Sequence, residues 1–170
     1  RRDGGHTWFL TTKTRIALPD GRPGVLGVCV DLTERKDAEE LLRESEEKHK
    51  ALYENAPIPY QSLDPDGRIL DVNPAWLRVL DYSREEVVGR WFGDFLAPDY
   101  VSNFERNFPE FKRRGSVHDV EFCMRRRDGS DIYVLFDGCI AFSATGEMKQ
   151  TYCVFRDITD LKRMESERLE

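Results

Sequence analysis

The chain has 170 residues, 39% of them hydrophobic, and a formal net charge of -6. This length and apolar content suit one domain with a single core and attached segments, while the negative charge argues against a nucleic-acid partner, which would need a basic face. No apolar run approaches the roughly 18 residues that cross a bilayer and the first residues lack the apolar core of a signal peptide, so we expect a soluble, cytoplasmic protein without a membrane segment.

Residues 1–32 carry a pattern that recurs near the end of the chain. Arg1-Arg2-Asp3-Gly4 matches Arg126-Arg127-Asp128-Gly129 and, after a slip of one residue, Asp31-Leu32-Thr33 matches Asp157-Ile158-Thr159. Between these anchors both copies contain two strand-like stretches joined by a turn. We therefore interpret residues 1–32 as the last hairpin of a truncated upstream domain.

A charged helical linker is predicted for residues 33–54. Asp31-Leu32-Thr33-Glu34 has the spacing of a capping box at its start, and Asp157-Ile158-Thr159-Asp160 is a weaker copy. The linker contains no glycine or proline, and positions spaced as in a two-helix seam run along it: Ala38, Leu42, Ser45, His49 and Leu52. Because Ser45 and His49 are poor seam residues, we expect a weak pairing, and a single solvated helix is the alternative.

Residues 55–158 contain the elements of one complete domain. Asn73-Pro74 starts a short helix, because asparagine caps well and proline loses nothing at the first helical position. Pro109 should kink or interrupt a longer helix, one face of which carries Val101, Phe104, Phe108 and Phe111. Strands are expected at about 59–63, 68–72, 116–125, 131–142 and 148–156. This order predicts an α+β fold with a five-stranded antiparallel sheet and short helices on one face.

The four cysteines are Cys29, Cys123, Cys139 and Cys153, and none forms a C-x-x-C pair of the kind that binds zinc or carries redox chemistry. Each lies in an apolar stretch, so we expect reduced cysteines that act as small hydrophobes. Cys139 and Cys153 could approach each other across a hairpin, which leaves redox sensing open.

Catalytic motifs are missing from the sequence. It contains no glycine-flanked nucleophile, no H-E-x-x-H zinc motif and no G-x-x-x-x-G-K-[ST] phosphate loop. Asp64, Asp66 and Asp71 cluster near the first turn, where turn and cap roles explain them. We therefore expect no enzymatic activity in this chain and no metal site.

Residues 50–158 resemble a PAS domain, the sensory-box module of bacterial signalling proteins. The resemblance rests on an ordered set of short motifs: Glu54-Asn55-Ala56-Pro57, Asp66-Gly67, Asn73-Pro74-Ala75, Leu80-Asp81-Tyr82-Ser83, Val88-Gly89, Arg127-Asp128-Gly129 and Asp157-Ile158-Thr159. Residues 1–32 resemble the end of another PAS domain. Tandem PAS units are typical of sensor histidine kinases and diguanylate cyclases, so the resemblance implies such an effector elsewhere in the protein.

The resemblance also implies a pocket between the sheet and the helices. Strand alternation then gives the inward residues, with Trp91 and Phe95 closing the pocket from the helical side. The strand residues are Gln61, Leu63, Val120, Phe122, Met124, Ile132, Val134, Phe136, Cys153 and Phe155. This lining has almost no polar groups, so a plain hydrophobic core is the alternative to a ligand pocket.

Known cofactors of the family can be compared with single residues. Photoreceptors of the light-oxygen-voltage group carry a reactive cysteine at the position that Phe92 takes in Gly89-Arg90-Trp91-Phe92, so that photochemistry is expected to be absent. Haem-binding relatives take a histidine from the long helix, and residues 98–114 contain none; His118 lies beyond it. The cofactor is unknown from the sequence, and a non-covalent small ligand stays open.

Signal relay is expected at the two strand-to-helix junctions, through Asp31 and Thr33 and through Asp157 and Thr159. Asp157 can cap an outgoing helix over residues 159–170 and pair with an arginine of the sheet, which would couple strand position to helix start.

Two functions remain open. The first is a sensor that responds to a small ligand or a partner and signals through helical linkers to an effector such as a histidine kinase. The second is a ligand-free relay and dimerisation spacer, or part of a diguanylate cyclase sensor. In both, a homodimer through the linker helices or the sheet face and neighbouring domains of the same protein are the expected partners.

Overall fold

The computed structural model describes residues 6–168, so the Arg1-Arg2-Asp3-Gly4 part of the predicted repeat lies outside the described residues. Contacts divide the chain into two units, the first ending at Ala51 and the second beginning at Leu52. Within residues 6–168, no helix combines the length and the apolar character needed to span a bilayer.

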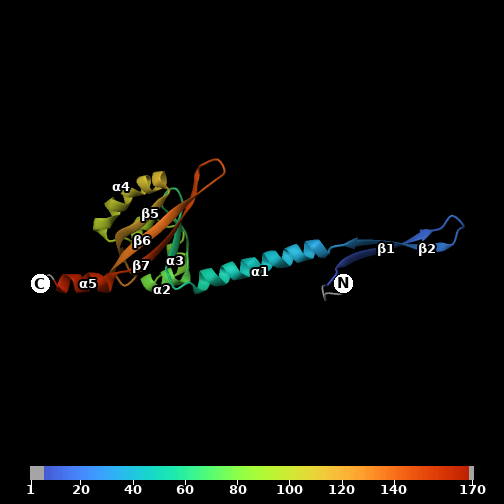
Figure 1. Ribbon diagram of the computed structural model, residues 1–170, viewed down its shortest axis with the longest axis horizontal. Coiled ribbons are helices and arrows are strands. Elements are labelled where there is room, and N and C mark those ends of the chain that lie inside the picture. The colour runs from blue at the N-terminus through green and yellow to red at the C-terminus, as the bar shows by residue number, and fades with distance from the viewer. Residues whose placement is uncertain (1–5, 169–170) are drawn as a thin grey trace. The chain divides into compact units, whose positions relative to one another are not determined.

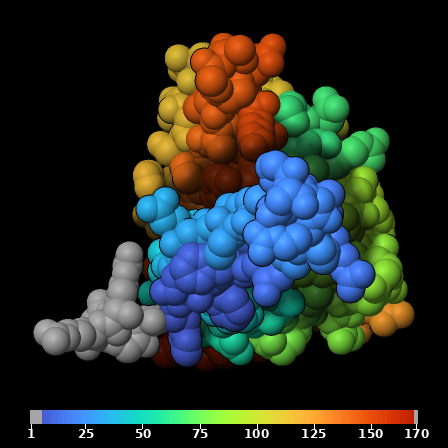
Figure 2. Space-filling view, turned by 90° about the vertical axis from the view of Figure 1, so that its right-hand side faces the viewer, coloured from blue at the N-terminus to red at the C-terminus, as the bar shows by residue number. Residues whose placement is uncertain are grey.

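The first unit contains a two-stranded hairpin and most of a long helix (Figure 1). Strands β1 (Phe9–Ala17) and β2 (Pro23–Asp31) pair antiparallel, and helix α1 (Thr33–Asn55) follows. The hairpin, blue in Figure 2, presents large apolar side chains at its surface: Trp8, Phe9, Leu10, Val25, Leu26, Val28 and Val30. An isolated two-stranded hairpin is marginal in water, so these residues lack the packing that a complete sheet would give them.

The second unit has the predicted α+β fold. Its sheet has the order β4-β3-β7-β6-β5, every neighbouring pair is antiparallel, and the helices between β4 and β5 cover one face (Figure 1). The elements are β3 (Tyr60–Leu63), β4 (Ile69–Val72), α2 (Pro74–Leu80), α3 (Arg84–Val87), the 3-10 helix η1 (Phe92–Phe95), α4 (Pro98–Arg114), β5 (Ser116–Arg125), β6 (Asp131–Phe142), β7 (Met148–Asp157) and α5 (Thr159–Glu167).

Asn73 joins the first two strands to the first short helix. Its side-chain oxygen accepts hydrogen bonds from the backbone N–H of Trp76, at 3.0 Å, and of Tyr60, at 2.9 Å. Its side-chain nitrogen donates to the carbonyl of Ile58 at 2.9 Å. The predicted helix cap is therefore present, and the same fully buried side chain also fixes the start of β3.

Helix α4 differs from the expectation at Pro109. The helix runs without interruption from Pro98 to Arg114, and Phe104, Phe108 and Phe111 are buried along one face as predicted. Pro109 is on the solvent side, so the carbonyl that loses its helical partner there can bond to water. Burial of the phenylalanine face keeps the helix whole, so the predicted interruption is wrong, and the alternative of a kink stays a prediction.

The approach of Cys139 to Cys153 that the sequence left open does not bring the two side chains together. Gly138 pairs with Cys153, and Cys139 pairs with Tyr152, so the two cysteines occupy adjacent register positions. Adjacent positions of a sheet point to opposite faces, and Cys153 is buried while Cys139 is exposed. A disulfide between them would require the strands to rearrange.

Burial should separate the cysteines by reactivity. Burial raises the pKa of the Cys153 thiol to about 11, and it also raises the pKa of Cys123, so both stay protonated at pH 8. We predict that brief treatment with a thiol reagent at pH 8, followed by mass spectrometry, labels Cys29 and Cys139 in the folded protein and all four cysteines in urea. Labelling of Cys153 as fast as Cys139 would contradict this packing.

Gly138 leaves room for the Cys153 side chain. A Cβ atom at residue 138 would lie 2.6 Å from the Cys153 sulfur. We predict that Gly138→Ala lowers the free energy of unfolding by about 1–3 kcal/mol, because overpacking shifts buried neighbours. In urea unfolding, adding Cys153→Ala should recover part of this loss, and strictly additive effects of the two substitutions would contradict the close approach.

Candidate functional site

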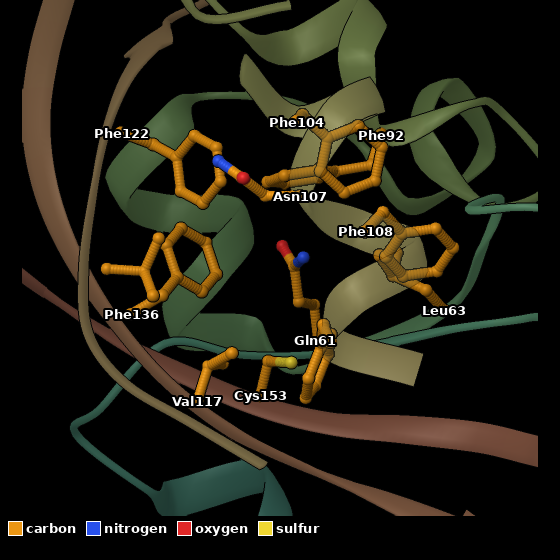
Figure 3. A pocket seen from close by; sticks show the side chains of 12 residues that line it. Gln61, Leu63, Phe92, Phe104, Asn107, Phe108, Val117, Phe122, Phe136 and Cys153 are labelled. Atoms are coloured by element: carbon orange, nitrogen blue, oxygen red, sulfur yellow. The ribbon is translucent and has the colours of Figure 1, made fainter. Parts of the chain in front are cut away.

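A small cavity lies between the sheet and α4 (Figure 3). Its volume is about 70 Å³, and its lining is almost wholly apolar. The lining residues are Gln61, Leu63, Phe92, Phe104, Asn107, Phe108, Phe111, Val117, Val120, Phe122, Phe136 and Cys153. Ligand pockets for drug-sized molecules have volumes of roughly 300–1,000 Å³, so a flavin does not fit this cavity.

Half of the predicted pocket residues border the cavity. They are Gln61, Leu63, Val120, Phe122, Phe136 and Cys153. The others do not border it, and among them Met124, Ile132, Val134 and Phe155 fill the core beside it. Alternation identified the correct face of each strand, but the cavity occupies only the part of that face that lies against the second half of α4.

Trp91 and Phe95 do not close the cavity as expected. Trp91 packs on Phe104 and lies against Gly93, where a Cβ atom would meet its ring at 2.1 Å. Phe95 packs edge-to-face on Trp76, with ring centroids 5.6 Å apart. Both rings are therefore used by the surrounding core rather than by the cavity wall.

Phe92 forms the helical side of the wall instead. Its ring meets Phe104, Phe122 and Phe136 edge-to-face, with centroids 5.0, 5.9 and 5.7 Å apart. Edge-to-face contacts stabilise aromatic clusters beyond their buried area. Phe92 also stands at the position of the reactive cysteine in the light-oxygen-voltage pattern, so a packed ring takes the place of a nucleophile.

Sequence reasoning missed the cavity residues that come from α4 and from the start of β5. Phe104, Phe108 and Phe111 were recognised as one apolar stripe, which indicates burial but not which buried side chains border a void. Asn107 lies on the same helix at the cavity and is exposed. Asn107 is three residues after Phe104 and four before Phe111, and this spacing could have placed it on the same face of the helix.

The junction between β7 and α5 is held by side-chain hydrogen bonds. The Thr159 hydroxyl oxygen accepts from the Tyr133 backbone N–H of β6 at 3.0 Å and donates to a carboxylate oxygen of Asp157 at 2.6 Å. The same Asp157 oxygen accepts from the Thr159 N–H at 2.9 Å, and the other lies 3.7 Å from the Arg126 guanidinium. The cap position of α5 is Ile158 rather than Asp157, but Asp157 accepts from the first N–H of the helix and faces an arginine. The first residue of the helix is therefore bonded to both strands.

The junction between β2 and α1 has the same arrangement. Trp8 donates its backbone N–H to the Thr33 hydroxyl at 3.0 Å, and Thr33 donates its own N–H to Asp31 at 2.9 Å. Leu32 N–H bonds to the Trp8 carbonyl, as Ile158 N–H bonds to that of Tyr133. In both copies the aspartate bonds to the third residue of the expected capping box rather than to the fourth. The repeat seen in the sequence is thus also a repeat of hydrogen bonds.

A second contact attaches α5 to the sheet. The ammonium group of Lys162 lies 2.8 Å from the Glu121 carboxylate on β5, and this pairing raises the pKa of Lys162. Both groups are partly exposed, so the ion pair contributes little energy by itself. It limits how far the first two turns of α5 can swing.

The last turn of α1 is bonded to the sheet by a cluster that sequence reasoning missed. The Tyr53 hydroxyl donates to Asp71 of β4 at 2.5 Å, and Asp71 also pairs with the Arg84 guanidinium. Arg84 donates further to the Val72 carbonyl at 2.6 Å. Burial and the bond to Asp71 raise the pKa of Tyr53, so it stays a donor. Asp71 is therefore not a turn residue, whereas Asp64 is, since it accepts from the N–H groups of Asp66 and Arg68.

The described residues form no cluster of three or more groups that could hold a metal ion. His118 is exposed on β5, with its ring nitrogen 3.4 Å from the Asp137 carboxylate, and it does not border the cavity.

Comparison with known proteins agrees with this geometry. A model of the PAS domain family matches residues 58–160. The two-component sensor PprA of Pseudomonas aeruginosa is 24% identical over 96% of this chain and 18% of its own length, and the sensor histidine kinase TmoS of Ectopseudomonas mendocina is 24% identical over 72% of this chain and 13% of its own. The chain thus spans less than a fifth of either relative.

A solved structure has the same fold. The PAS domain of an HTR-like protein from Haloarcula marismortui superposes with a TM-score of 0.61 at 29% identity, covering 72% of this chain and 99% of that one. The five-stranded sheet, its helical cover and the family match lead to one conclusion: the chain belongs to the PAS domain family of sensory modules.

Proposed function

We propose that the domain senses a small ligand or a partner at its cavity and passes the change through α5 to an effector such as a histidine kinase. PprA and TmoS support this effector class, because one is a two-component sensor and the other a sensor histidine kinase. A diguanylate cyclase is the alternative effector. The module itself is non-catalytic, and we place it in the cytoplasm.

The hydrogen bonds of the Thr159 hydroxyl are the main support for the proposed relay. It bonds to the backbone of β6 and to Asp157 on β7, while Phe136 of β6 and Cys153 of β7 line the cavity. The cavity and the start of α5 therefore share two strands. A change at the cavity that slides β6 against β7 must stretch one of the two bonds at Thr159, which tilts or loosens the helix start.

The incoming side is coupled in a similar way. Tyr53 at the end of α1 is bonded to Asp71 of β4, and β4 pairs with β3, which pairs with β7. This places a hydrogen-bonded path from the incoming helix to the outgoing strand. We infer that the domain also relays signals from a preceding domain.

The first unit supports a tandem arrangement. Its hairpin repeats the hydrogen bonds of the β7–α5 junction, so we propose that residues 6–32 close the sheet of a preceding PAS domain. The α1 linker would then join two sensory modules. Leu42 and Leu52 are exposed on α1, which suits pairing with α1 of a second copy.

A ligand-free dimerisation spacer remains the second proposal, because the cavity is small. Native mass spectrometry and light scattering of the purified chain separate the two. A retained small molecule favours the sensor, whereas a dimer that carries none favours the spacer.

The relay is tested by Thr159→Val in the full-length protein. We expect effector output, measured as autophosphorylation from ATP, to change about fivefold or more, because the helix start loses both bonds of the hydroxyl. Ser166→Ala is the matched control, since the Ser166 hydroxyl bonds only within α5. Equal output from wild type and Thr159→Val would contradict the relay, and a protein that is not phosphorylated from ATP would contradict the kinase assignment.

The incoming coupling is tested by Tyr53→Phe. Loss of the short bond to Asp71 should lower the free energy of unfolding by about 1 kcal/mol in urea denaturation. Tyr100→Phe is the control, because the Tyr100 hydroxyl lies 3.5 Å from Glu121 and should contribute little. Equal effects of the two substitutions would argue against a coupled incoming helix.

A further inference from the structure

The cavity contains one deeply buried polar side chain. Gln61 on β3 is 1% exposed, and it borders the cavity together with the apolar wall. Figure 3 shows its amide group pointing into the space between Phe136, Phe108 and Phe92. Gln61 and Asn107 are the only amide side chains in the lining, and Asn107 is exposed.

A hydrogen bond fixes which way the Gln61 amide is turned. The indole N–H of Trp76 lies 2.9 Å from the Gln61 side-chain oxygen, in the buried core. An indole N–H can only donate, so the group facing it must be the amide oxygen. The amide nitrogen, with its two donor hydrogens, is therefore the atom left for other partners.

The Gln61 nitrogen has no hydrogen-bond partner within residues 6–168. Every fully enclosed polar side-chain atom in that part of the chain does have one, so this nitrogen is not enclosed by protein and faces the cavity. A donor that faces an apolar cavity has no acceptor in the cavity wall, which favours occupation of the cavity by an acceptor.

The cavity also limits the size and charge of an occupant. A cavity of about 150 Å³ holds the six carbon atoms of benzene, so about 70 Å³ corresponds in proportion to roughly three non-hydrogen atoms. No charged side chain borders it, and burial keeps the Cys153 thiol neutral by raising its pKa. An ionic ligand would find no counter-charge, so the occupant must be neutral.

We propose that the cavity binds a small neutral organic molecule whose oxygen accepts a hydrogen bond from the Gln61 side-chain nitrogen. Small ketones, ethers and alcohols of about three or four non-hydrogen atoms have this chemistry. The proposal rests on the sensor function and specifies its ligand class. Trp76 is the positioning residue, because it turns the Gln61 donor toward the cavity without bordering the cavity itself.

The test compares two probes of the same shape. Acetone has an acceptor oxygen where 2-methylpropene has a CH₂ group. The two probes also differ in hydration, but that difference is the same for every variant of the protein. A change in the ratio of their dissociation constants between wild type and variant therefore reports the hydrogen bond. Both constants are measured by NMR titration of the ¹⁵N-labelled 170-residue chain and of Gln61→Met. We expect the preference for acetone to fall about 3- to 10-fold in Gln61→Met.

Gln150→Met provides a matched control, since Gln150 is the only other glutamine and does not border the cavity. The ratio of the dissociation constants of the two probes should be the same in Gln150→Met as in the wild type. The Gln61 side-chain NH₂ signal should also shift on addition of acetone and not of 2-methylpropene, while the Gln150 signal stays in place. This spectral readout needs no folded variant.

Trp76→Phe tests the positioning. Gln61 then keeps its donor but loses the bond that fixes its orientation, so the preference for acetone should also fall, although the cavity lining is unchanged.

Three outcomes would overturn the proposal. The first is that neither probe binds, which would leave only water in the cavity. The second is that the ratio of the two dissociation constants is the same in Gln61→Met as in the wild type. The third is that the Gln61 side-chain NH₂ signal does not shift on addition of acetone. In each case, a change of effector output in Thr159→Val would still support the relay function. Failure of the ligand proposal can therefore be told apart from failure of the relay function.

Discussion

The hydroxyl group of Thr159 holds the outgoing helix to two neighbouring strands at once. It accepts from the Tyr133 N–H of β6 and donates to Asp157 of β7, so the first residue of α5 cannot move without disturbing the pairing of those strands. The helix is otherwise attached mainly by a partly exposed ion pair. In the proposed relay, control of α5 by the sheet depends on this junction, where a change at the cavity would become a change in helix position.

The cavity wall consists largely of tightly packed aromatic rings. Phe92, Phe104, Phe122 and Phe136 pack edge-to-face, and closely packed interiors transmit strain rather than absorb it. The cavity interrupts this packing where Phe136 and Cys153 meet the second half of α4. In the proposed relay, an occupant at that place would push on the same strands that hold Thr159, over a short path from ligand to helix.

Much of this organisation could be predicted from local sequence. Patterns that act within a few residues predict the Asn73 cap, the α4 phenylalanine stripe and the Asp157-Thr159 junction. The internal repeat supported the prediction of the junction, because the same residues occur at both strand-to-helix junctions. The cavity border, the Tyr53-Asp71-Arg84 cluster and the orientation of Gln61 were missed because each joins residues far apart in the chain. The sequence left an approach of Cys139 to Cys153 open because distance along a hairpin does not tell which face a side chain occupies. The predicted interruption at Pro109 is absent because burial of α4 outweighs the loss of one helical hydrogen bond.

Amide hydrogen exchange measured by NMR in wild type and Thr159→Val tests the coupling of strand to helix most directly. The Tyr133 N–H loses its partner in the variant, whereas the Lys162 N–H bonds to the Ile158 carbonyl in the first turn of α5 and keeps its own. If the junction holds the helix start, exchange at both amides accelerates together by about tenfold, equivalent to roughly 1.4 kcal/mol of local opening free energy. Faster exchange at Tyr133 with an unchanged rate at Lys162 would contradict the account.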